Sequence, residues 1–293
     1  YMKDKGLPGT GDYVKVGPLG DWLAPEETDL QLLWNAFYYR EAHLMEKIAH
    51  LVGDDAQAAL YGELADQVKS YWNATFIDAR TKTAAGESCD TQCSYALGLE
   101  YGVIADEWRA KAEEHLLRKT RELHHTVGTG FFGTGLLNFA LTHAGKTADA
   151  YELMLQTQFP SWLYPVTQGA TTIWEHWDSF TKEKGFGGQN AMNSFNHYSL
   201  GSVLSWLYEV VLGIQRDEVH PGYAHFYLKP EPQKLARAKG SVASLYGTIH
   251  AGWEETDGHY VYRCEIPVNT SATLCYPDGR TEELGSGKYE VIL

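Results

Sequence analysis

The stretch LQLLWNAFYYREAHLMEKIAHL (residues 30–51) decides the fold class, because its apolar residues recur with the spacing of an α-helix. Six apolar side chains share one helical face: Leu30, Leu33, Phe37, Leu44, Ile48 and Leu51. Gly53 is a typical helix stop, and Asp54 and Asp55 can open the next helix. The stretch therefore predicts the first half of an antiparallel helical hairpin.

The helical pattern continues along the chain to about residue 213. The second helix carries an apolar set of its own: Ala58, Leu60, Tyr61, Leu64, Val68 and Trp72. Further helices are predicted over residues 91–102, 105–125, 134–143, 146–157 and 194–213. The connecting loops are short or rich in glycine, as a series of helical hairpins requires.

The pattern changes to the alternation of β-strands near residue 220. Strands are predicted over residues 224–228, 241–246, 247–253 and 259–266. Thr256-Asp-Gly258 and Pro277-Asp-Gly279 are hairpin signals. We therefore expect a mainly α chain with a β tail, in which residues 1–219 form a helical domain and residues 220–293 a small antiparallel β-sandwich.

Charge and composition exclude several classes of protein. The chain has 24 Lys and Arg against 38 Asp and Glu, a net charge of −14, which argues against binding to nucleic acid. No run of about 18 apolar residues is present, so no membrane partner is predicted. The first residues lack the apolar core of a signal peptide, and both the cytoplasm and the periplasm remain open as compartments.

The four cysteines do not predict a metal site. Cys89 and Cys93 are four positions apart, Cys264 and Cys275 lie far downstream, and no C-x-x-C spacing occurs. We interpret them as buried free thiols, because either pair would form a disulfide only in an oxidising compartment. No residue cluster argues for a structural calcium ion either.

Aromatic residues are abundant, with 9 Trp, 19 Tyr and 10 Phe. They indicate either a large core or a carbohydrate site, in which ring faces cover the apolar C–H face of a sugar. Two loop-like segments are relevant. In residues 20–25, Asp21 and Trp22 suit an aromatic platform, or a core plug beside a structural acid. Residues 128–135, GTGFFGTG, either line a cleft or form a plain turn, and no Lys-Ser/Thr follows to bind phosphate.

Two further segments carry candidate chemistry. In GATTIWEHWDS (residues 169–179), Glu175 lies between Trp174 and Trp177, with His176 and Asp178 adjacent. A carboxylate among indoles loses hydration, which suits a general acid or base, although a capping or salt-bridged Glu is the alternative. In NSFNHY (residues 193–198), Asn193 or Ser194 is expected to cap the last helix. His197 would then lie in its first turn, facing a cleft or buried with a hydrogen bond.

In this order, the four segments resemble the α-L-rhamnosidases of glycoside hydrolase family 78. The likeness lies in residues 20–23, 127–131, 170–179 and 193–202, and it continues through residues 244–249. It implies an (α/α)6 barrel of six helical hairpins followed by a C-terminal β-sandwich. It also implies hydrolysis of terminal α-L-rhamnose from rhamnosides or polysaccharides with inversion, and no organic cofactor.

The resemblance implies roles for individual residues. An inverting enzyme pairs a general acid with a general base that activates water, and the base of the family falls on Glu175. Trp22 and His197 fall on positions that line the sugar pocket. The other expected substrate-binding residues belong to the same motifs: Asp21, Phe131, Trp174, Trp177 and Asp178.

Two departures from the family pattern are evident. The family's general acid lies in an acidic segment ending Gly-Trp-x-Gly-Asp upstream of Gly20, and neither Asp4 nor Asp12 lies in such a motif. A full barrel needs twelve helices, whereas the pattern predicts seven or eight. We therefore expect the C-terminal part of a longer enzyme, whose exposed helix faces are covered by its other half or by self-association. The alternatives are another glycosidase on the six-hairpin fold and a non-catalytic carbohydrate-binding fragment.

Overall fold

The computed structural model describes residues 19–78, 83–187 and 192–293, so Asp4 and Asp12 lie outside the described residues. The chain divides into two compact units, Tyr1–Gly201 and Ser202–Leu293. The first unit is helical and the second is mainly β, which confirms the predicted fold class of an α region with a β tail. The domain boundary between residues 219 and 220 stays a prediction.

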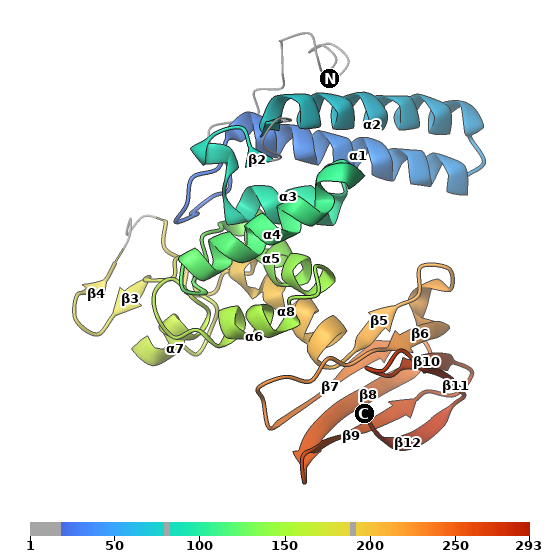
Figure 1. Cartoon of the computed structure of the whole chain (residues 1–293). Helices are drawn as coiled ribbons and strands as arrows, with labels where there is room; N and C mark the ends of the chain where they lie inside the picture. Colours follow the sequence, from blue (N-terminus) through green and yellow to red (C-terminus); the bar gives the residue numbers. More distant parts are fainter. Residues whose placement is uncertain (1–18, 79–82, 188–191) are drawn as a thin grey trace. The chain divides into compact units, whose positions relative to one another are not determined.

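The predicted hairpin is formed by α1 (Leu30–Leu51) and α2 (Asp55–Phe76), which lie side by side (Figure 1). Each helix has an aspartate cap, because the Leu32 N–H donates to Asp29 at 2.9 Å and the Gln57 N–H donates to Asp54 at 3.1 Å. The buried Trp72 indole donates to the Leu32 carbonyl at 3.1 Å and ties the two helices together.

The next four helices begin and end within three residues of the predicted positions. They are α3 (Gln92–Tyr101), α4 (Asp106–Glu122), α5 (Phe131–His143) and α6 (Thr147–Leu155). A capping box starts α3, in which the Ser94 N–H donates to the Thr91 hydroxyl and the Thr91 N–H donates to the Ser94 hydroxyl. One short helix, α7 (Leu163–Gln168), was not predicted. The short strands β1 (Ile77–Asp78), β2 (Thr83–Ala84), β3 (Phe180–Thr181) and β4 (Gly185–Phe186) were not predicted either.

The predicted last helix is wrong at its start. Residues 193–198 are not helical, and the segment begins with a 3-10 turn (Ser199–Ser202) followed by α8 (Val203–Trp206) and a π-helical turn (Leu207–Val211). The backbone of residues 193–198 bonds elsewhere, because the Ser194 carbonyl accepts from Glu175 and the His197 N–H donates to Ile173. Neither Asn193 nor Ser194 is therefore a helix cap, and His197 lies before the helix rather than in its first turn.

The β unit contains two four-stranded sheets with the strand orders β11-β10-β6-β5 and β12-β9-β8-β7. Their pairs are antiparallel except β6 with β10, which is parallel. Trp253 and Tyr262 donate to the carbonyls of Val211 and Leu212, which fixes the second sheet to the π-helical turn. The strands are β5 (Ile214–Arg216), β6 (His225–Leu228), β7 (Arg237–Ser244), β8 (Gly247–Thr256), β9 (His259–Ile266), β10 (Ser271–Cys275), β11 (Thr281–Leu284) and β12 (Gly287–Ile292).

The cysteines are free thiols, as predicted, but Cys275 is only partly buried. Cys89, Cys93 and Cys264 are buried, and burial raises the pKa of Cys89 and of Cys264 to about 11. None of the described helices combines the length and the apolar character that crossing a bilayer requires.

An ion pair between a buried aspartate and an exposed arginine joins α4 to α6. Asp149, near the start of α6, accepts from Arg121 at 2.9 and 3.0 Å and lies 2.9 Å from His125 Nε2. Burial opposes ionisation of Asp149, but the hydrogen bonds from Arg121 and His125 outweigh it, and the pKa of this carboxyl is lowered.

Replacing Asp149 by Asn should lower the free energy of unfolding at neutral pH by about 2 kcal/mol, because hydrogen bonds to charged groups contribute about 1.5–3 kcal/mol. Urea unfolding followed by circular dichroism measures the loss. A lowered pKa means that the stabilisation is complete above the ordinary value of 3.8 and is lost as the pH falls through the folded-state value, so the deficit should shrink in acid.

The control for this variant is Arg109→Ala, which removes an ion pair within α4 whose acid, Glu113, is more exposed than Asp149. We expect a change below about 0.5 kcal/mol for the control, as for other surface pairs. Equal losses in the two variants, or a deficit that does not vary with pH, would contradict the role of Asp149.

Candidate active site

The loop at residues 20–24 is fixed to the start of α5 by the buried carboxylate of Asp21. Its Oδ2 accepts from the Gly130 N–H at 2.7 Å, and its Oδ1 accepts from Phe132 at 2.7 Å and Gly133 at 3.2 Å. The carboxylate therefore caps α5, whose own N-cap residue, Gly130, makes no side-chain bond. The Cys93 thiol lies close to this carboxylate. Burial raises the pKa of the thiol well above its ordinary value, and the negative charge of Asp21 adds to this shift.

Gly130 allows the two loops to approach each other closely. The Phe131 N–H donates to the Trp22 carbonyl at 3.0 Å. A Cβ at position 130 would overlap the carbonyl oxygens of Asp21 and Trp22 and lie 2.8 Å from the Ala24 nitrogen. Glycine is thus required here for space. The glycine-rich segment holds a neighbouring loop rather than a phosphate.

Glu175 is held by the segment at residues 193–198. Its backbone N–H donates to the Ser194 carbonyl at 2.8 Å, and its Oε2 accepts from the Ser194 N–H at 2.8 Å. The side chain is buried, with 8% of the residue exposed. Among the residues that the structure describes, no donor reaches Oε1, so this oxygen is the one that a water molecule could use.

The two tryptophans beside Glu175 are buried and pack against other rings. Trp174 contacts Phe195 edge-on, with ring centroids 5.3 Å apart, and Trp177 contacts Trp162 edge-on at 5.7 Å. The Trp162 indole donates to the Leu200 carbonyl at 2.8 Å. These contacts position the residues on both sides of Glu175. The sequence analysis missed Trp162 and Phe195, because no local spacing links them to Glu175.

Phe131 connects the Asp21 loop and the glycine-rich loop with the two segments that contain Glu175 and His197. Its ring lies 4.7 Å from the His197 ring, at an angle of 32°. Because Phe131 follows the Asp21-bound loop and the His197 N–H donates to the Ile173 carbonyl, contacts link all four predicted segments. Trp22, Phe131 and His197 are each partly exposed, so their rings have surface available for a ligand. Asp178, three residues after Glu175, is also partly exposed.

A polar network that the sequence analysis missed fixes the first residue of the glycine-rich loop by hydrogen bonds. The Gln92 side chain accepts from the Gly128 N–H at 2.6 Å, and Glu26 accepts from the Gln92 N–H at 3.1 Å and from Lys119 at 2.6 Å. These residues lie on separate elements, so no motif of fixed spacing could have revealed them.

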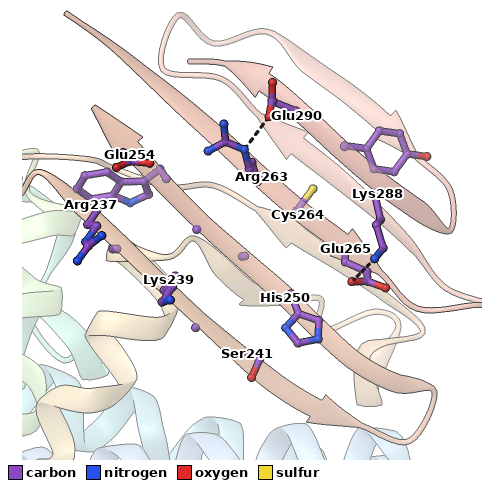
Figure 2. Close-up of a pocket in the computed structure, with 16 residues that line it drawn as sticks. Arg237, Lys239, Ser241, His250, Glu254, Arg263, Cys264, Glu265, Lys288 and Glu290 are labelled. Carbon is purple, nitrogen blue, oxygen red and sulfur yellow. Dashed lines mark hydrogen bonds and ion pairs between the residues drawn. The ribbon is translucent and has the colours of Figure 1, made fainter. Parts of the chain in front are cut away.

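A second concave surface lies on the sheet β12-β9-β8-β7. It is a pocket of about 860 Å³ (Figure 2). Figure 2 shows two ion pairs among its charged side chains, with Arg263 2.6 Å from Glu290 and Lys288 3.4 Å from Glu265. None of the predicted site residues lines it. Within the described part of the chain, the only group with the spacing of a metal site is Asp217, His220 and His225, in the β unit.

Two family models match the chain. The bacterial alpha-L-rhamnosidase 6 hairpin glycosidase domain covers residues 5–211, and the bacterial alpha-L-rhamnosidase C-terminal domain covers residues 213–290. An alpha-L-rhamnosidase of Streptomyces avermitilis is 34% identical over 260 residues, which are 88% of this chain and 24% of that protein. One of Formosa agariphila is 33% identical over 284 residues, which are 93% of this chain and 30% of that protein.

Solved structures show the same likeness. The Streptomyces avermitilis alpha-L-rhamnosidase complexed with L-rhamnose superposes with a TM-score of 0.89 at 30% identity, over 100% of this chain and 29% of that one. The native alpha-L-rhamnosidase of Aspergillus terreus also superposes with a TM-score of 0.89 at 30% identity. The match covers 99% of this chain and 34% of that one. This chain thus spans less than a third of the length of the curated relatives described above. The predicted six-hairpin fold is confirmed by these matches.

Gly130→Ala should destabilise the helical unit by about 2 kcal/mol or more, because the added methyl meets backbone atoms that cannot move independently. Urea unfolding gives the magnitude, and hydrogen exchange should show lost protection at Phe131 and Phe132. The matched control is Gly62→Ala in α2, where the methyl meets only the flexible end of Glu46 and should be neutral or slightly stabilising. Similar stability of the two variants would contradict the close approach of the loops.

Proposed function

This chain belongs to the bacterial alpha-L-rhamnosidase family, and we propose that it carries the general base and the sugar-binding wall of an inverting α-L-rhamnosidase. Its matched relatives are named alpha-L-rhamnosidases, and one was solved with L-rhamnose. Because the chain spans less than a third of those proteins, hydrolysis of rhamnose-containing substrates is itself part of the proposal.

The observation that carries the proposal is the environment of the Glu175 carboxylate. It is buried, it is oriented by the Ser194 N–H through one oxygen only, and it lies between two buried tryptophans that pack against other rings. A general base needs this combination, because its orientation must be fixed while one lone pair stays available for the proton of a water molecule.

The proposed step is a single displacement. Water attacks the anomeric carbon of an α-L-rhamnoside from the face opposite the glycosidic oxygen, and Glu175 takes a proton from that water. The bond from the anomeric carbon to the glycosidic oxygen breaks, and a general acid gives the departing oxygen a proton. The products are β-L-rhamnose and the free alcohol. Such pairs of carboxyl groups lie about 6.5–9.5 Å apart, which leaves room for the water.

The partly exposed rings supply the sugar-binding wall in this proposal. Trp22 and His197 line the pocket, and Phe131, held against His197, covers the apolar C–H face of the ring. Asp178 accepts hydrogen bonds from sugar hydroxyls. Trp174, Trp177 and Asp21 were predicted to bind substrate as well. Their burial favours a positioning role, in which the tryptophans hold Glu175 and Asp21 holds Phe131.

Glu175→Gln should reduce hydrolysis about 10²–10⁴-fold, because the amide cannot take the proton of the attacking water. The substrate to use is α-L-rhamnosyl fluoride beside p-nitrophenyl α-L-rhamnoside. Fluoride departs without a proton, so its release reports the base even where no general acid is supplied. Proton NMR of the first product should show the β-anomer.

The matched control is Glu183→Gln, which removes an exposed carboxylate from the turn between β3 and β4. Turnover of the fluoride that survives in Glu175→Gln, or a first product with the α-configuration, would overturn the proposal. Binding of rhamnose without turnover of the fluoride would support the alternative of a carbohydrate-binding fragment.

Phe131→Ala and His197→Ala should each weaken rhamnose binding about fivefold, because each removes a ring worth about 1 kcal/mol at the sugar face. Their effects should not add, since the two rings contact each other. Titration calorimetry measures the affinities. Tyr276→Ala, an aromatic change in the β unit, should leave binding unchanged. Additive losses, or an equal loss in Tyr276→Ala, would argue against a shared wall.

A further inference from the structure

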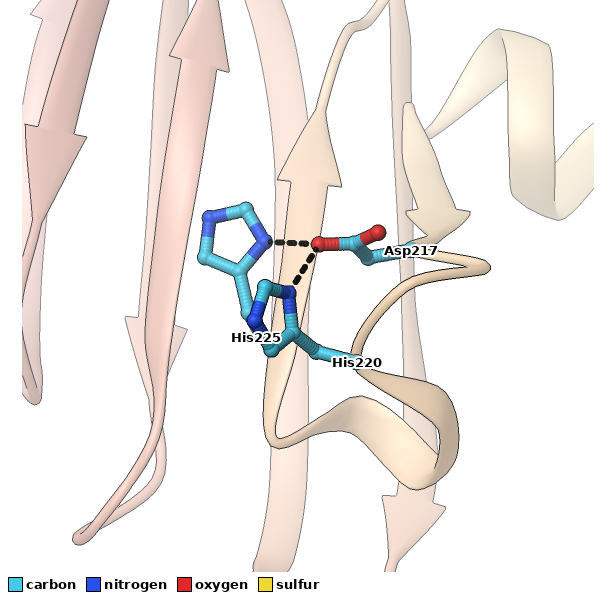
Figure 3. Close-up of side chains that lie close together, drawn as sticks. All are labelled: Asp217, His220 and His225. Carbon is cyan, nitrogen blue, oxygen red and sulfur yellow. Dashed lines mark hydrogen bonds and ion pairs between the residues drawn. The ribbon is translucent and has the colours of Figure 1, made fainter.

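Three side chains of the β unit converge between β5 and β6. Asp217 follows β5, His220 precedes a 3-10 turn, and His225 begins β6 (Figure 3). Asp217 Oδ2 lies 2.8 Å from Nδ1 of His220 and 2.8 Å from Nδ1 of His225. The three ligand atoms lie within 4.8 Å of one another. Two imidazole nitrogens and a carboxylate oxygen thus face one point.

Two of the three side chains are fixed by their surroundings. The other oxygen of Asp217, Oδ1, accepts from the Val219 N–H at 2.9 Å, and only 7% of the residue is exposed. His225 Nε2 lies 3.0 Å from the Thr273 hydroxyl, which itself donates to Glu283 at 2.6 Å. His220 differs, because 60% of its side chain is exposed, so it can move and leaves access from solvent.

A hydroxyl and a carboxylate hold the outer side of His225. The Thr273 hydroxyl has a single hydrogen and gives it to Glu283, so the hydrogen bond to His225 needs the proton on Nε2. Its other nitrogen, Nδ1, faces Asp217 Oδ2 and His220 in the cluster. A ligating histidine whose other nitrogen donates to a hydroxyl and carboxylate chain is the usual outer support of a metal site.

We propose that Asp217, His220 and His225 bind a divalent transition metal ion of the zinc class. Imidazole and carboxylate together suit zinc, and also iron, cobalt or nickel, better than they suit calcium or magnesium. Tetrahedral ligands about 2.0–2.1 Å from zinc lie about 3.3 Å apart, so the present spacing must open by about half an ångström. The exposed His220 can supply that movement. Three protein ligands leave the fourth position to water or to an external ligand.

A metal ion bound at this site would stabilise the β unit by cross-linking its strands. Its ligands connect the loop after β5 with β6, and the Thr273–Glu283 chain extends the connection to β10 and β11. A metal bound only by the folded chain stabilises it in proportion to its concentration over its dissociation constant. The sequence analysis predicted no metal site because it looked at cysteine spacing, whereas the signal here is D-x2-H-x4-H.

The test is titration of the whole chain with Zn²⁺ and with Co²⁺, followed by calorimetry and by the visible absorption of cobalt. We expect one ion per chain, a tetrahedral cobalt spectrum and a raised Tm with zinc. His220→Asn should weaken zinc binding at least tenfold without unfolding the chain, because the side chain is largely exposed. Thr273→Val should weaken it about 10–100-fold through loss of outer support.

His250→Asn, at an exposed histidine of β8, is the matched control and should bind zinc like the unchanged chain. Equal affinities in His220→Asn and His250→Asn would overturn the site, as would half an ion per chain or no zinc binding at all. A stronger response to Ca²⁺ or Mg²⁺ than to Zn²⁺ would also overturn it.

Discussion

The contact between the Asp21 carboxylate and the first turn of α5 is the constraint on which the candidate site depends. The carboxylate accepts from backbone N–H groups more than a hundred positions away along the chain, and Asp21 and Gly130 are both buried. Because a helix start has unpaired N–H groups, an aspartate from another loop can fix both the helix and the loop at once. Phe131 lies between the Asp21-bound amides, and its ring contact with His197 carries this constraint to the segments around Glu175. Loss of the carboxylate would therefore free more than one loop.

The other half of the site depends on hydrogen bonds between two segments without regular structure. The backbones of Ile173 and Glu175 pair with those of His197 and Ser194, so residues 193–198 cannot also begin a helix. A helix there would satisfy the same backbone groups locally, but it would release Glu175 from the Ser194 N–H. The contact of the buried Trp174 ring with the partly buried Phe195 ring favours the paired arrangement, since it covers apolar surface that a longer helix would leave in water.

Most of the architecture could be predicted, because it is determined by local pattern. Leu33 and its periodic neighbours indicate α1, and Asp54 marks the start of α2. What could not be predicted depends on residues distant in sequence. The start of α5 at Phe131 depends on a cap from Asp21, and the loop at His197 depends on Ile173. The unusual composition of the four segments made them stand out in the sequence, and the structure brings them into contact. Their mutual contacts and the support from Trp162 and Gln92 follow only from the tertiary structure.

Burial alone does not separate a structural carboxylate from a chemical one. Asp21 and Glu175 are exposed to 7% and 8%, and each lies in a loop beside aromatic residues. They differ in how their oxygens are occupied. Both oxygens of Asp21 accept from backbone N–H groups, so binding a sugar there would require breaking bonds that hold α5. Glu175 accepts from Ser194 through Oε2 alone, and the described residues leave Oε1 without a donor. The second oxygen of Glu175 is therefore open to a hydrogen donor from outside the chain, which is what the proposed role of an inverting base requires of it.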